Sequence, residues 1–157
     1  MWARFSNKEI NDLVKAWLAI SLAFAIILNA KNSFMLSFLI AGLTVGIGFI
    51  AHELSHKFIA QRYGCLAEFR SFDTMLILAV IMSLFGFVFV APGGVFIQGM
   101  IGTIRNGRIS AAGIIANLVV AALFLVLFLT TPFTLIASYG FTINSWLALF
   151  NLIPFGN

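Results

Sequence analysis

Charged residues are scarce in this chain of 157 residues, at 9% of the total, whereas a soluble domain carries about 25%. Hydrophobic residues make up 62%, and mean hydropathy is +1.09. The nine basic residues are scattered, and no cluster of them alternates with aromatics, which excludes a nucleic-acid partner. The single cysteine, Cys65, excludes an internal disulfide and a C-x-x-C metal knuckle. These shortages indicate an α-helical integral membrane protein surrounded by lipid bilayer.

Long apolar runs set the expected helices. An N-terminal run preceded by basic residues also resembles a signal peptide, but Leu28-Asn29-Ala30 is a poor cleavage site and a retained helix is preferred. With no repeat or linker, residues 1–157 are expected to form one polytopic domain. The second helix is expected to end at a glycine cap at Gly64. About four membrane helices are predicted, over residues 13–28, 34–62, 110–129 and 142–152.

The segment 74–104 is expected to form a re-entrant hairpin or a short β segment that breaks at Pro92-Gly93-Gly94. The stretch before it, 65–73, reads as a polar link. Residues 105–108 read as a turn, because Asn-Gly favours one, and 138–140 fall in a connection. With the hairpin, the basic groups at 57–70 and 105–108 share the cytoplasmic side. A single crossing would put them on opposite sides. The expected location is the cell membrane, as a multi-pass protein.

The sequence His52-Glu53-Leu54-Ser55-His56 lies inside a long apolar run. Ionisable groups in a membrane helix are expensive and indicate function. Histidines at i and i+4 share one helix face and can bind zinc, and Glu53 can act as the general base on a water molecule. His56 lies six residues before the basic Arg62, roughly 9 Å at 1.5 Å per residue. This predicts a zinc site near the cytoplasmic face. The alternative is a chance match in a polar intramembrane network.

A catalytic zinc needs three protein ligands, and the third is not evident among the other acids. Glu9 and Asp12 read as solvated residues at the end of the first helix. Glu68 and Asp73 are expected to pair with a neighbouring arginine, Arg62 or Arg70, rather than with a metal.

The HExxH motif occurs together with Gly113-Ile114-Ile115-Ala116-Asn117 and with Asn151-Leu152-Ile153-Pro154. In this order the three motifs resemble the site-2 protease family of intramembrane zinc metalloproteases, over nearly the whole chain after residue 34. Ile114 stands where the family usually has proline. In that family a Leu-Asp-Gly motif follows shortly after the last of these motifs, and its Asp is the third zinc ligand. The resemblance therefore implies that the sequence is truncated just before that motif.

The resemblance implies Zn²⁺ as cofactor and cleavage of transmembrane segments of membrane-tethered regulatory proteins. It places Asn151 beside the active site, where its amide could bind substrate or the oxyanion. Asn117 has the same possible role or a packing role, and Gly93 and Gly94 belong either to a loop beside the site or to a simple turn. A catalytically inactive relative that binds metal or transmembrane segments remains an alternative, as does a zinc peptidase acting on protein ends.

Overall fold

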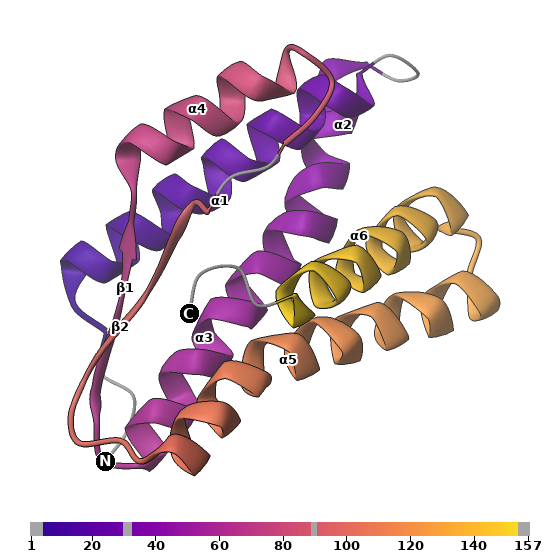
Figure 1. Ribbon diagram of the computed structural model, residues 1–157. Helices are drawn as coiled ribbons and strands as arrows, with labels where there is room; N and C mark the ends of the chain where they lie inside the picture. The colour runs from indigo at the N-terminus through magenta and orange to yellow at the C-terminus, as the bar shows by residue number, and fades with distance from the viewer. Residues whose placement is uncertain (1–4, 30–32, 89–90, 154–157) are drawn as a thin grey trace.

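The computed structural model describes residues 5–29, 33–88 and 91–153. Its helices follow the apolar runs of the sequence, and its two strands occupy the more polar stretches between them (Figure 1). In chain order the elements are α1 (Asn7–Leu28), α2 (Phe34–Ala41), the π-helix η1 (Gly42–Gly46), α3 (Ile47–Arg62), β1 (Leu66–Ser71), α4 (Asp73–Ser83), β2 (Gly93–Gln98), α5 (Thr103–Thr130) and α6 (Thr134–Leu152).

Three of the described helical segments are long and apolar enough to cross a membrane. They are residues 7–28, the continuous run 34–62 through α2, η1 and α3, and residues 103–130. α6 has 19 residues, but it is not among these candidate spans, so a fourth membrane helix stays a prediction. A polytopic membrane protein is consistent with these helices.

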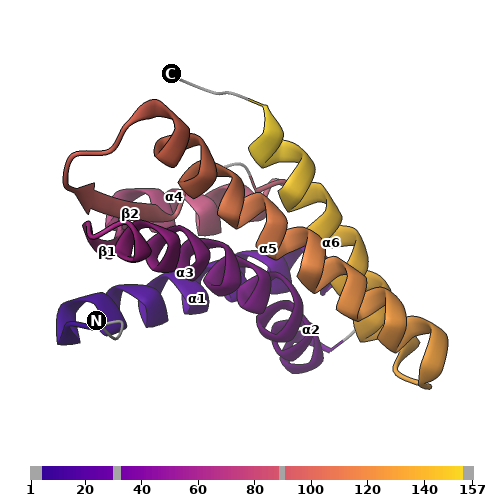
Figure 2. The same ribbon diagram turned by 90° about the horizontal axis from the view of Figure 1, so that it is seen from below.

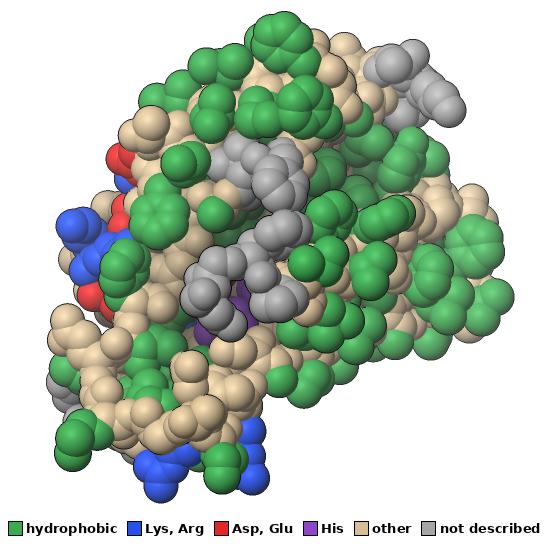
Figure 3. Space-filling view, in the orientation of Figure 1, with side chains coloured by type: hydrophobic (Ala, Val, Ile, Leu, Met, Phe, Trp, Pro, Cys, Tyr) green, Lys and Arg blue, Asp and Glu red, His purple; other side chains and the backbone are tan. Residues whose placement is uncertain are grey.

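Helix α3 lies at the centre of the molecule, between α1 on one side and α5 on the other (Figure 2). α5 and α6 pack together along their lengths, and α4 packs against α1. The space-filling view shows apolar side chains over the helical faces, while charged side chains gather toward the end that carries β1 and β2 (Figure 3). α3 ends at Arg62, and the expected glycine cap follows it: Gly64 has φ +81° and lets the Cys65 N–H donate to the Ala60 carbonyl.

The segment 74–104 reverses direction, as predicted, but the turn lies elsewhere. α4 runs away from β1, and the chain turns at residues 84–86, where Gly86 has φ +87°. It then returns as β2, which pairs antiparallel with β1. Gly93 and Gly94 begin this strand and pair with Ser71 and Arg70, so they are not the break that the sequence suggested. Glycine without a side chain adopts positive φ freely, which favours Gly86 as the turn.

Three local predictions were wrong. The stretch 65–73 is not a loose link, because it contains β1. Residues 105–108 do not form a turn, because they belong to the first turns of α5. Residues 138–140 lie inside α6 and not in a connection. The first stretch pairs with β2, and the other two continue the helices α5 and α6, so in each case the longer element overrides the local propensity.

A polar row at the start of α1 holds β1 and the start of α4 in place. It consists of the N-cap residue Ser6 with Glu9, Asp12 and Lys15; successive members, three residues apart, are neighbours on the helix surface, and the row winds part of the way around the helix. Their partners follow in the same order along the chain: the Glu68 carboxylate, the Phe69 N–H at 3.0 Å, the Arg70 guanidinium at 3.9 Å and the Asp73 carboxylate at 2.7 Å. The prediction that Glu9 and Asp12 are solvated was therefore wrong.

Candidate metal centre

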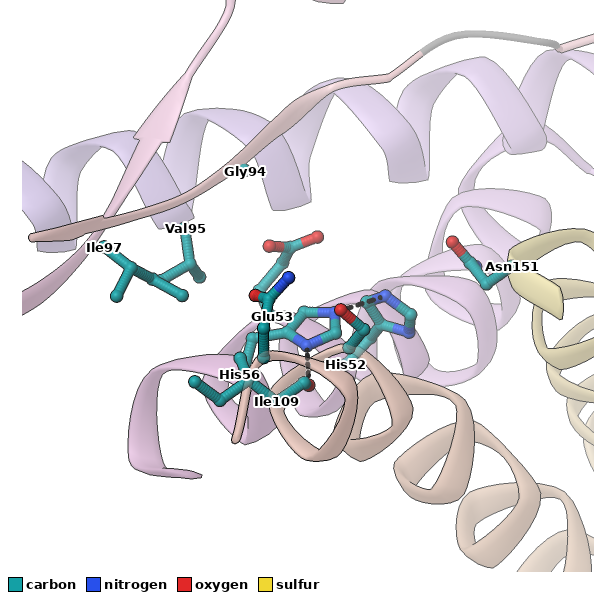
Figure 4. A pocket seen from close by; sticks show the side chains of 10 residues that line it. His52, Glu53, His56, Gly94, Val95, Ile97, Ile109 and Asn151 are labelled. Atoms are coloured by element: carbon teal, nitrogen blue, oxygen red, sulfur yellow. Dashed lines mark hydrogen bonds between the residues drawn. The ribbon is translucent and has the colours of Figure 1, made fainter. Parts of the chain in front are cut away.

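The HExxH residues lie on α3 and border a cavity of about 360 Å³. The i, i+4 spacing puts both histidines on the face of α3 that packs against α5 (Figure 4). On the other side of the cavity lies strand β2. The residues that line it are His52, Glu53, His56, Gly94, Val95, Ile97, Asn106, Ile109, Ser110 and Asn151.

Both imidazole rings are held by hydrogen bonds to α5. His56 Nδ1 donates to the Ile109 carbonyl at 2.7 Å. His52 Nδ1 donates to Asn117 Oδ1 at 2.6 Å. The Asn117 amide is oriented by its own donations, to Asn144 Oδ1 at 3.1 Å and to the Gly48 carbonyl at 3.5 Å. Because a carbonyl or amide oxygen only accepts, each neutral ring carries its proton on Nδ1.

The two Nε2 atoms are consequently unprotonated, and they lie 3.0 Å apart. Two nitrogen lone pairs at this distance repel each other unless a cation lies beside both. Neutral imidazoles whose other nitrogen donates to a carbonyl or amide are the usual ligands of zinc. The donor set and its outer hydrogen bonds therefore fit a metal ion held by His52 and His56.

Gly113 makes this approach of α5 to the histidines possible. A Cβ at position 113 would lie 2.5 Å from His56 Nε2 and 2.6 Å from His52 Nε2. Such distances are far below van der Waals contact, so any side chain here would displace the imidazoles. The glycine of the G-x-x-x-N motif thus has a direct steric role at the centre.

No third ligand completes the centre among the described residues, where no group of three His, Cys, Asp or Glu side chains comes together. The four other acids form ion pairs with basic residues of α1, α3 or β1. Glu68 pairs with Arg70 at 2.6 Å, as expected, whereas Asp73 pairs with Lys15 and not with an arginine. The segment where the resemblance places the next ligand lies beyond the described residues.

The other predicted site residues are divided between the cavity and its surroundings. Asn151, near the end of α6, lines the cavity, and so does Gly94 (Figure 4). Gly93 does not line it; a Cβ there would lie 2.4 Å from the Arg70 carbonyl, so its small size serves sheet packing. Asn117 has no exposed surface and lies behind His52, which agrees with the packing alternative rather than with substrate contact. Pro154 of the last motif falls outside the described residues.

Sequence reasoning missed Asn144 and the steric role of Gly113. Asn144 belongs to no motif, and its partner Asn117 lies 27 residues away in the chain. The only local signal is an amide in the middle of an apolar helix, which is costly unless it is hydrogen-bonded. For Gly113 the sequence did carry a signal: it lies four residues before Asn117, so both residues lie on one face of α5.

The two basic groups that were expected to share one side do lie at the same end of the molecule. The Arg105 guanidinium lies 5.4 Å from the centroid of the Tyr63 ring, which follows α3. This brings the start of α5 beside the end of α3. Which side of a membrane this end faces remains a prediction.

Fold and site together define a membrane-type helical protein with an HExxH metal centre on a candidate spanning helix. No family model matches the chain, and no solved structure matches it. A protein of Methanocaldococcus jannaschii named "Putative zinc metalloprotease" is 42% identical over 157 residues, which covers 96% of this chain and 80% of that protein. The chain belongs to the same family of zinc metalloproteases.

Proposed function

We propose that this protein is an intramembrane metalloprotease of the site-2 type, which binds zinc and hydrolyses peptide bonds in transmembrane segments of other membrane proteins. The observation that carries the proposal is the position of the centre. Two unprotonated Nε2 atoms converge 3.0 Å apart beside Glu53, on a helix of 29 residues with hydropathy 2.2. The peptide bonds that a metal centre on such a helix hydrolyses would lie within the bilayer.

His52 and His56 would hold the zinc through Nε2. The chemistry that zinc supplies in such sites is Lewis-acid activation of a water molecule and of the scissile carbonyl. Glu53 lines the same cavity and follows His52 directly on α3. Its carboxylate takes a proton from the attacking water and delivers it to the leaving amide nitrogen. Asn151, whose side chain lies across the cavity, would bind the substrate backbone or the developing oxyanion.

Strand β2 offers an edge on which an unwound substrate can bind. The Phe69 N–H donates to α1 and the Ala67 carbonyl accepts from a side chain of α3, so both point away from β2. In an antiparallel ladder their partners, Val95 and Ile97, then also direct their backbone groups outward. Both residues line the cavity. Addition of the substrate as a further strand would hold its backbone extended beside the histidines.

The test uses the protein as its gene encodes it, purified in detergent with zinc and mixed with a model protein that has one transmembrane segment and a soluble domain. Cleavage within the apolar segment, located by mass spectrometry, is the expected result. Glu53→Gln keeps the size and polarity of the side chain but cannot act as a base, so it should bind zinc and lose cleavage. Cleavage at the wild-type rate by this variant would contradict the assigned role. Cleavage confined to the soluble domain would contradict the intramembrane site.

The lack of a third ligand among the described residues favours a second candidate, a non-catalytic relative that binds metal or transmembrane segments. Both candidates predict zinc binding that depends on His52 and His56. They differ in turnover: the non-catalytic relative binds the model substrate without releasing a fragment.

A further inference from the structure

Asn144 lies in the middle of α6 and has no exposed surface. Its amide is engaged at both ends. The oxygen accepts from Asn117 Nδ2 at 3.1 Å, and the nitrogen donates to the Gly140 carbonyl at 2.9 Å and to the Thr44 carbonyl at 3.4 Å. Because the nitrogen is occupied by two carbonyls, the oxygen must face Asn117.

The close approach of Asn144 to the central helix is built into the backbone. A Cβ on Gly48 would lie only 1.9 Å from Asn144 Oδ1, so only glycine leaves room for this amide. Gly48 lies one turn before His52 on α3. Thr44, whose carbonyl receives the other end of the Asn144 amide, belongs to the π-helix η1. Asn144 thus connects α6 and η1 to the helix of the metal centre.

The Asn117 amide can turn in two ways. With Oδ1 toward His52, as observed, the ring carries its proton on Nδ1 and presents a bare Nε2 to the cavity. With the amide reversed, its N–H would face Nδ1, the ring proton would move to Nε2, and this nitrogen could no longer bind a metal. Asn144 Oδ1, at 3.1 Å, accepts from the Asn117 N–H and selects the first orientation; the Gly48 carbonyl favours the same orientation from the longer distance of 3.5 Å.

We propose that Asn144 is a positioning residue for the metal centre: it orients the Asn117 amide and thereby sets which nitrogen of His52 faces the metal. The chain of contacts runs from α6 through α5 to α3. This role of Asn144 rests on the proposed zinc site, in which His52 is a ligand. Outer hydrogen-bond partners of zinc-bound histidines typically change metal affinity by about 10–100-fold when they are lost.

The first experiment compares zinc affinity, by competition with a chromophoric chelator, in the wild type, Asn144→Leu and Thr44→Val. Leucine keeps the branching of Asn144 but carries larger methyl groups and accepts no hydrogen bond, so the zinc Kd should rise about 10–100-fold. Thr44→Val is the matched control: it removes a buried hydroxyl that bonds to the Ile40 carbonyl and keeps the Thr44 carbonyl. Its Kd should stay at the wild-type value. Equal affinities of Asn144→Leu and the wild type would overturn the proposal.

The second experiment separates orientation from packing. In an Asn117→Asp background, a carboxylate presents an oxygen to His52 in either orientation and needs no partner to turn it. Asn144→Leu should therefore cause no further loss of zinc affinity in that background. A loss as large as in the wild-type background would show a merely structural role and would refute the proposal.

The third readout needs no metal. The chain has only two histidines, so the ¹⁵N signals of His52 can be identified by comparison with His56→Ala. Metal-free wild type should show the Nδ1–H tautomer, and Asn144→Leu a mixture. Asn144→Asp keeps an acceptor for Asn117 and should retain the wild-type tautomer even where the leucine variant does not fold. A mixture in Asn144→Asp, or a single Nδ1–H tautomer in Asn144→Leu, would overturn the proposal. Wild type that binds no zinc would refute the proposed function but not this tautomer assignment.

Discussion

Lys57→Met is expected to cost more stability than a change in any other ion pair of the described residues. The Lys57 ammonium and the Glu9 carboxylate contact each other directly, and both side chains have 0% exposed surface. Glu9 Oε1 also accepts from the Phe69 N–H at 3.0 Å. Removing one partner of a buried pair leaves an uncompensated charge, which costs about 3–5 kcal/mol. A domain has a free energy of unfolding of about 5–15 kcal/mol, so this loss is a large fraction.

The assay is equilibrium unfolding in mixed detergent micelles, followed by circular dichroism, for Lys57→Met, Glu9→Leu and the double variant. Each single variant should lose about 3–5 kcal/mol. The double variant should recover most of the loss, because no buried charge of this pair remains, while the Phe69 N–H loses its acceptor at a cost of about 1–3 kcal/mol. Asp73→Asn is the control, since its ion pair with Lys15 is solvent-exposed and should contribute far less.

A loss below about 1 kcal/mol in Lys57→Met, the range of surface pairs, would refute the reasoning that this pair is buried and essential. A double variant as unstable as the sum of the single ones would also refute it, because the two charges would then not be coupled.

Four further changes test the site, the sheet and the ion pair between Lys15 and Asp73. Gly113→Ala puts a methyl group 2.5 Å from His56 Nε2, so bound zinc, measured by atomic absorption, should fall while the helical content is kept; unchanged zinc would contradict this placement. Val95→Pro removes an outward N–H and should slow substrate cleavage with little change in melting temperature, whereas Phe96→Pro removes a hydrogen bond to β1 and should lower that temperature. A hydrogen bond from Lys15 lowers the pKa of Asp73, so the ionised carboxylate stabilises the fold at pH values above its ordinary pKa. The wild type should then have a higher free energy of unfolding than Asp73→Asn, and this difference should vanish as the pH falls through the lowered pKa.

The helices and the histidine pair could be predicted because their signals are local. Apolar runs define the helices, and the i, i+4 spacing of His52 and His56 fixes a shared face wherever the helix lies. The strand β1 also carried a signal, since Ala67 and Phe69 alternate with polar neighbours and are buried. This alternation was hidden by the charges on the other face, which made the stretch read as a link.

The partners of buried polar residues could not be predicted, because they come from distant parts of the chain. Glu9 and Lys57 are 48 residues apart, and nothing in their immediate sequence joins them. The same holds for Asn144, whose role follows from three helices packing together rather than from any motif.

The π-helix η1 sets the direction in which the metal centre points. A π-turn accommodates one residue more than an α-turn, and one residue corresponds to about 100° of rotation around the helix axis. Everything after Gly46 is therefore rotated relative to an unbroken α-helix that starts at Phe34. If the same residues were wound as an unbroken α-helix, with none removed, His52 and His56 would turn away from α5 by about 100° and lose their hydrogen-bond partners. Deleting one residue within Gly42–Gly46 would offset that rotation and return the histidines to α5, so the face on which the HExxH motif lies depends on the number of residues in this one turn.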